Sequence, residues 1–155
     1  NPKNSGVVAA FESQKIEGFF ASHVEERVRS ALEALRSTGH LVGVSSGNYP
    51  DLIGRYIERE KLGFDLVMGY DHDRGFEKGK PHFDFFLERF GLGKSGLTFV
   101  GDSLKDADKG YDYGVQFIGV TGLFTHEDFD REHPGVFTVS GIDEIPRIFE
   151  NRKKA

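Results

Sequence analysis

Two carboxylates follow an apolar run in the second half of the chain. Residues 97–106 read LTFVGDSLKD, so Asp102 follows the run directly and Asp106 stands four residues later. Carboxylates held within about 4–6 Å raise each other's pKa, whereas a divalent cation keeps both ionised and can bind a phosphate on its far side. Ser103 and Asp106 also fit a helix capping box, which leaves Asp102 unexplained. The spacing indicates a helix start, and metal-binding and structural roles both stay open for the pair.

A lysine and a glycine-containing loop are the candidate anion-binding elements. Lys80 stands before Pro81 in GKPHFDFF, and a cation at a helix start opposes the helix dipole by about 0.3–1 kcal/mol unless an anion lies nearby. Ser46, Gly47 and Asn48 offer a hydroxyl, a close backbone approach and exposed N–H groups before a helix, which suits a phosphate. The alternatives are a solvated surface lysine and an ordinary turn.

The apolar pattern predicts strands that alternate with helices along most of the chain. Such an alternation is typical of an α/β fold with a doubly wound, Rossmann-like parallel sheet and helices on both faces. The ligand site then lies beyond the carboxyl ends of the strands, where Ser46, Asp71 and Asp102 fall. The expected helices are 24–37, a segment opened by Pro50, 81–90, 104–111 and about 142–149, and the expected strands are 41–44, 64–70, 97–100, 115–120 and 136–139.

Composition limits the classes of partner. The 155 residues suit one compact domain, and the formal charge of −5 argues against nucleic-acid and anionic-membrane surfaces and favours a small-molecule ligand. Cysteine is absent, which excludes disulfides and thiolate metal sites. Without a secretory signal or an apolar run near 18 residues, we expect a cytoplasmic protein. The sequence does not determine the oligomeric state.

Taken together, the motifs resemble those of the haloacid dehalogenase-like hydrolase superfamily over about residues 24–149. LVGVSSGN is similar to the family's second motif, which implies that Ser46, with Ser45 as the alternative, binds the transferring phosphoryl group. EKGKPHFDFF is similar to the third motif, with Lys80 as the phosphate-binding lysine and Lys78 as a second candidate.

FVGDSLKD is similar to the family's acidic fourth motif, so the resemblance makes Asp102 a direct Mg²⁺ ligand and Asp106 a supporting carboxylate. It implies a magnesium-dependent phosphomonoester phosphatase that acts on a small phosphorylated metabolite through an aspartyl-phosphate. The alternative is a catalytically inactive protein of the same fold that binds a ligand or a partner. A signalling receiver domain is disfavoured, because its acidic pair near the first strand has no counterpart.

The family's first motif, an Asp-x-Asp after the first strand, has no match before Val24. Residues 1–23 are interpreted either as a cap remnant or as a degenerate first strand at 7–11 followed by Glu12, and the cap interpretation is preferred. The nucleophile-bearing strand would then precede Asn1, and this chain alone would be inactive. Residues 24–150 form the expected core, and 151–155 form a solvated tail.

Several other motifs are set aside. Asp71 to Gly75 is interpreted as a solvated turn, and the six histidines show no paired metal spacing. The chain has neither the Gly-x-Ser-x-Gly elbow of serine hydrolases nor a complete phosphate-binding loop ending in Gly-Lys-Ser.

Overall fold

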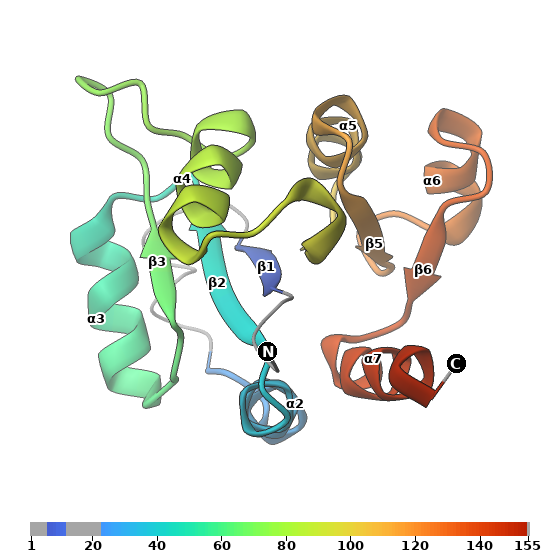
Figure 1. Ribbon diagram of the computed structural model, residues 1–155, viewed down its shortest axis with the longest axis horizontal. Helices are drawn as coiled ribbons and strands as arrows, with labels where there is room; N and C mark the ends of the chain where they lie inside the picture. The colour runs from blue at the N-terminus through green and yellow to red at the C-terminus, as the bar shows by residue number, and fades with distance from the viewer. Residues whose placement is uncertain (1–5, 12–22, 155) are drawn as a thin grey trace.

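The computed structural model describes residues 6–11 and 23–154, which form a six-stranded sheet flanked by helices (Figure 1). The strand order is β3-β2-β1-β4-β5-β6, and every neighbouring pair is parallel. The predicted doubly wound α/β fold is therefore confirmed. The strands are β1 (Gly6–Phe11), β2 (Leu41–Ser46), β3 (Leu66–Met68), β4 (Leu97–Gly101), β5 (Gln116–Val120) and β6 (Phe137–Val139).

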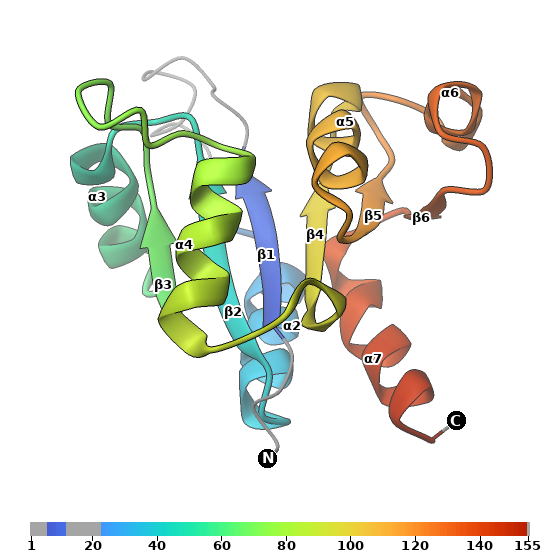
Figure 2. The same cartoon turned by 45° about the horizontal axis from the view of Figure 1, so that its top comes forward.

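The helices form two layers, one on each face of the sheet. In Figure 2 the strand arrows run toward one edge, with α4 in front of the sheet and α2 behind it. Buried side chains of α4, α5 and α6 share one apolar cluster, and those of α2 and α7 share the other. The helices are α2 (Glu26–Ser37), α3 (Pro50–Glu60), α4 (Lys80–Phe90), α5 (Leu104–Tyr113), α6 (His126–Glu132) and α7 (Ile145–Lys154), with short 3₁₀ turns η1 (Lys94–Gly96) and η2 (Ile142–Glu144).

Successive residues of the central strands supply the two apolar clusters in turn. Phe99 and Phe117 point into the cluster beneath α4, α5 and α6, whereas the next residues, Val100 and Ile118, point into the cluster beneath α2 and α7. A strand covered on both faces must be apolar on both, because its side chains alternate. This explains why these strands read as continuous apolar runs in the sequence.

The first strand corrects the preferred interpretation of the N-terminal segment. Residues 6–11 are not part of a cap: they form β1, which pairs with β2 on one side and with β4 on the other. A central slot has to be filled, since its neighbours would otherwise leave backbone donors and acceptors unpaired at about 1–3 kcal/mol each. Glu12 and the rest of 12–22 lie outside the described residues.

Two other differences have local causes. The helix α6 was not predicted, because only Phe129 of its residues is buried and HEDFDRE therefore shows no apolar period. The predicted strand at 64–70 is shorter, with β3 covering Leu66–Met68. The turn predicted after it is confirmed, and an antiparallel bridge between Asp71 and Phe76 closes it. Among the described helices, none is both long and apolar enough to cross a membrane.

Candidate active site

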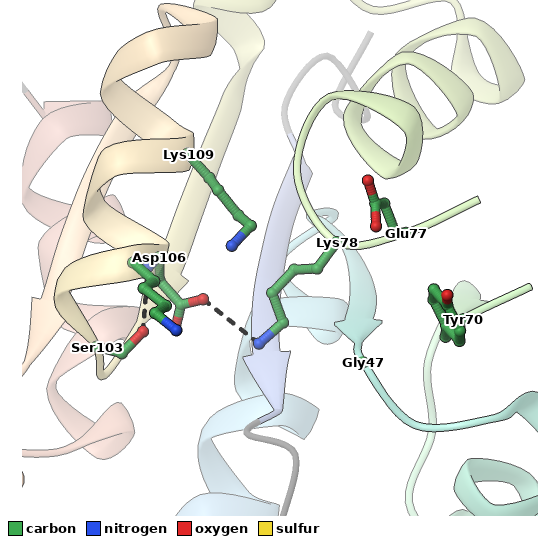
Figure 3. Close-up of a pocket in the computed structure, with 8 residues that line it drawn as sticks. Gly47, Tyr70, Glu77, Lys78, Ser103, Asp106 and Lys109 are labelled. Atoms are coloured by element: carbon green, nitrogen blue, oxygen red, sulfur yellow. Dashed lines mark hydrogen bonds and ion pairs between the residues drawn. The ribbon is translucent and has the colours of Figure 1, made fainter. Parts of the chain in front are cut away.

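A pocket of about 570 Å³ lies beyond the carboxyl ends of the central strands. Its walls come from segments that each follow a strand or begin the next helix: the loop after β2, the loop after β3, the residues before α4, and the first turns of α5. Figure 3 shows side chains from the α4 side and from α5 directed toward a shared space. The lining residues are Gly47, Tyr70, Glu77, Lys78, Ser103, Lys105, Asp106 and Lys109.

Asp106 is anchored at the first turn of α5. Its backbone N–H donates to Ser103 Oγ at 3.0 Å, so Ser103 is the helix cap that the sequence predicted. The side chain is 1% exposed and packs on the end of β4, where a Cβ built on Gly101 would lie 2.7 Å from Asp106 Oδ2. The carboxylate is therefore held against the backbone next to Asp102.

One carboxylate oxygen of Asp102 lies in an environment that favours a bound cation. Its Oδ1 is buried and accepts no hydrogen bond from any residue that the structure describes. A buried carboxylate oxygen without a donor is costly, and a bound cation removes that cost. The capping function of Ser103 and Asp106 leaves this oxygen unexplained, which favours a metal-binding role over a purely structural one.

The two candidate lysines occupy different environments. Lys78 is 11% exposed, and its Nζ lies 3.3 Å from Asp106 Oδ1 in the pocket. Lys80 is 74% exposed, lies outside this pocket, and pairs instead with Asp84 at 2.6 Å. Of the two candidate phosphate-binding lysines, the structure therefore places Lys78 in this pocket and Lys80 in a smaller neighbouring one that Lys78 also lines. The reason is that α4 begins at Lys80, so that Asp84 lies one turn further along the same helix face.

The serine loop presents its backbone, and not its hydroxyls, to the pocket. Ser45 and Ser46 are both fully buried, and of the loop residues only Gly47 lines the pocket. Ser46 Oγ accepts hydrogen bonds from the backbone N–H of Asn48 at 3.1 Å and from its side-chain amide at 3.2 Å. Ser46 and Asn48 therefore shape the turn that places Gly47.

Comparison with known proteins identifies the family. The model of the haloacid dehalogenase-like hydrolase family matches residues 7–120, which begin within β1 and end with β5. The chain belongs to this family. A search of curated proteins finds no significant relative.

Several solved structures share the haloacid dehalogenase-like fold. A predicted phosphatase from Clostridium acetobutylicum superposes with a TM-score of 0.75 at 20% identity, over 87% of this chain and 63% of its own. A predicted phosphoglycolate phosphatase from Haemophilus somnus superposes with a TM-score of 0.65 at 19% identity, over 80% of this chain and 56% of its own. The L-2-haloacid dehalogenase from Xanthobacter autotrophicus superposes with a TM-score of 0.63 at 16% identity, over 86% of this chain and 71% of its own. This chain thus spans less than two thirds of the length of the two phosphatase structures.

His82 of this haloacid dehalogenase-like core is a buried neutral residue behind the pocket. It is fully buried, with Nε2 2.8 Å from the carbonyl oxygen of Gly69 and Nδ1 2.6 Å from Ser45 Oγ. Burial lowers the pKa of His82 to about 4, and the nearby charge of Lys78 adds to this effect. In the neutral ring Nε2–H donates to Gly69 and Nδ1 accepts from the Ser45 hydroxyl. The hydroxyl of Ser45 is therefore hydrogen-bonded to His82 of α4.

The donor set is compatible with the Mg²⁺ that the family implies. Within residues 6–11 and 23–154, no three His, Asp or Glu side chains cluster around a metal position. Mg²⁺ is commonly bound by one or two carboxylates together with waters and substrate phosphate, so Asp102 and Asp106 suffice as protein ligands. The buried Oδ1 of Asp102, which accepts no hydrogen bond from the described residues, agrees with this fit.

Sequence reasoning missed Tyr70, Glu77 and Lys109, which line the pocket in this core. Tyr70 stands in a connecting segment without a motif, whereas Glu77 opens EKGKPHFDFF and was passed over because only its lysines were considered. Lys109 stands one turn after Lys105 on α5, and this spacing could have indicated that both lie on one face of the helix.

Proposed function

We propose that this chain is the core of a magnesium-dependent phosphomonoester phosphatase that acts on a small phosphorylated metabolite. The observation that supports this most is the meeting of Lys78 with Asp106 in a pocket that Ser103, the residue after Asp102, also lines. A phosphoryl group needs a cation that binds its oxygens, and a catalytic metal needs carboxylates. Both kinds of group come together at the carboxyl edge of the sheet, where doubly wound folds bind ligands.

Each residue has a role that its environment suits. Lys78, which Asp106 holds in place, would bind a phosphoryl oxygen, and the backbone N–H of Gly47 would donate to another. Asp102 and Asp106 would hold the Mg²⁺, each through a buried carboxylate oxygen, Asp102 Oδ1 and Asp106 Oδ2, that accepts no hydrogen bond within the part of the chain that the structure describes. The bound ion would neutralise charge on the phosphoryl oxygens. His82 and Ser45 position the start of α4 behind Lys78.

Glu12 is the candidate nucleophile. Because β1 occupies the central slot, the first acid after it in the sequence is Glu12, where the family has its attacking aspartate. A carboxylate that attacks phosphorus displaces the alcohol and forms an acyl phosphate, which water then hydrolyses to phosphate and the free carboxylate. The placement of Glu12 lies outside the described residues, so this role is inferred from chain order alone.

The test is magnesium-dependent hydrolysis of p-nitrophenyl phosphate by the chain as it stands. We expect turnover that Glu12→Gln abolishes, since loss of a catalytic nucleophile costs about a million-fold elsewhere. Lys80→Met serves as the matched control, because it removes one positive charge outside the pocket. Turnover that persists undiminished in Glu12→Gln contradicts the assignment of Glu12. Turnover seen only in a chain extended upstream of Asn1 contradicts it as well.

A catalytically inactive phosphate-binding protein is the second candidate. The observation that favours it is the sequence after β1, Glu12-Ser13-Gln14, which offers no acid at the second position of the family's Asp-x-Asp motif. Binding of inorganic phosphate without hydrolysis, both in this chain and in an extended one, would support this function over the phosphatase.

A further inference from the structure

Lys109 is one of three lysines that line the pocket, with Lys78 and Lys105, and neither the capping of α5 nor the family motifs explain it. It stands one turn beyond Asp106 on α5 and is half-buried. Its aliphatic stem lies over Gly79, where an added Cβ would approach Lys109 Cδ to 3.2 Å. Figure 3 shows its ammonium group directed into the space between Asp106 and the segment that carries Lys78.

The backbone at Gly79 keeps this space open. Gly79 has a φ of 108°, a conformation that side chains with a Cβ rarely adopt, and it directly follows Lys78. The stem of Lys109 therefore crosses the chain next to Lys78 without obstruction. Lys109 and Lys78 thus reach one pocket from different walls, Lys109 from α5, which also contributes Lys105, and Lys78 from the loop before α4.

Three lysines line the pocket against two carboxylates, those of Glu77 and Asp106. Asp106 offsets the charge of Lys78 at 3.3 Å, whereas Lys109 forms no ion pair with any carboxylate that the structure describes. Lysines are seldom buried without a partner, because the loss of hydration is then uncompensated. An anion in the pocket would compensate Lys109 and reduce its repulsion with Lys78.

We propose that Lys109 is a second anion-binding residue, so that the substrate carries a further negative group beside its phosphoryl group. This inference rests on the proposed function, since the phosphoryl group has to occupy the site at Lys78. The substrate class is then the small phosphorylated carboxylic acids or diphosphates, in preference to the phosphates of neutral alcohols and sugars. Lys109 is a specificity-determining residue in this assignment.

The experiment measures the binding of two phosphonates to the intact chain by isothermal titration calorimetry in the presence of Mg²⁺. Phosphonoacetate and ethylphosphonate share the phosphonate group and differ in a carboxylate replaced by a methyl group, and neither requires turnover. We expect phosphonoacetate to bind about ten-fold tighter or more, as a charge-assisted contact predicts. Lys109→Met, which keeps the stem over Gly79, should bring the ratio of the two affinities close to one.

Matched variants separate a direct contact from a general charge effect. Lys61→Met makes the same change in net charge at an exposed position at the end of α3, away from both pockets that Lys109 lines, and should leave the ratio unchanged. Lys109→Arg should restore the ratio, and thermal unfolding of each variant shows that it is folded.

Each outcome has a distinct meaning. Equal binding of both phosphonates by the wild-type chain, or a ratio that Lys109→Met leaves unchanged, overturns the assignment of Lys109 while the phosphate site stands. If neither phosphonate binds the wild-type chain, the proposed phosphate site fails and this inference fails with it.

Discussion

At the scale of single residues, Lys78 and Lys80 differ in what their loss would do. Lys78→Met removes the ammonium group 3.3 Å from the 1% exposed Asp106, and we expect a loss of about 1–3 kcal/mol in the free energy of unfolding, because a buried ion pair is broken. Lys80→Met breaks an exposed helical pair and should cost about 0.5 kcal/mol or less. Urea denaturation in magnesium-free buffer measures both. Equal effects would contradict the assignment of Lys78 to the pocket.

The same two lysines show what a motif can and cannot specify. Their spacing in EKGKPHFDFF places both near a helix start, but the sequence does not say at which residue the helix begins. Because α4 begins at Lys80, that lysine pairs with Asp84 and leaves Lys78 to the pocket. Asp102 and Asp106 were easier to predict, since their distances from a buried strand end fix their positions.

His82 makes the stability of the fold depend on pH. Its pKa of about 4 in the folded chain lies below the ordinary value of 6.5, so the unfolded chain binds the proton more readily. The stabilisation from the neutral ring is complete above about pH 6.5 and is lost as the pH falls toward 4. A shift of this size corresponds to about 3 kcal/mol.

We therefore expect the free energy of unfolding to fall between pH 7 and pH 5 and the fall to be smaller in His82→Gln. Urea denaturation at both pH values provides the measurement. An NMR titration in which the His82 ring protonates near pH 6.5 in the folded chain would refute the argument.

At the scale of secondary-structure elements, one aromatic side chain determines how closely α4 approaches the sheet. Phe86 is fully buried over β1 and β2, and a Cβ added at Gly6 or at Gly43 would come within 2.4 or 2.7 Å of its ring. Both strands carry glycine where this ring lies. The contact fixes α4, and hence the loop with Lys78 that precedes it.

Gly43→Ala should destabilise the fold by about 1–3 kcal/mol, since the added methyl group would overlap the buried ring of Phe86. Gly54→Ala is the matched control: Gly54 lies within α3, and an added Cβ there meets nothing within 4 Å. Its helix propensity should raise stability by about 0.5–1 kcal/mol. Thermal unfolding of the two variants distinguishes them, and a neutral Gly43→Ala would show that α4 is held elsewhere.

At this scale, a helix or strand can be predicted from the sequence when its buried residues form a clear apolar pattern. The runs at β2, β4 and β5 are apolar on both faces and were readily recognised. The segment that forms α6 buries only Phe129, so it offers no helical period. The strand β1 has the apolar pattern of its neighbours, but the missing Asp-x-Asp motif outweighed that pattern in the interpretation. Its pairing with β2 on one edge and with β4 on the other shows that it is a strand of the sheet and not part of a cap.

At the scale of the whole molecule, the strand order makes one edge of the sheet the functional edge. The order β3-β2-β1-β4-β5-β6 reverses direction at β1, from which the chain first builds outward to β3 and then returns to β4. Helices that follow the strands on either side of this point lie on opposite faces, so their first turns diverge and leave a crevice. Lys78 reaches this crevice from one side, and Asp106 reaches it from the other.

A metal bound in this crevice should stabilise the entire fold. A ligand present at about 100 times its dissociation constant adds about 2.7 kcal/mol to the free energy of unfolding, which in a domain of this size raises the unfolding temperature by several degrees. We expect this rise with MgCl₂ and not with NaCl at equal ionic strength. Asp102→Asn should abolish it without destabilising the metal-free chain, because the carboxylate it removes has a buried oxygen that accepts no hydrogen bond from the described residues. Differential scanning calorimetry of both proteins makes the measurement, and an equal rise in Asp102→Asn would exclude Asp102 as a ligand.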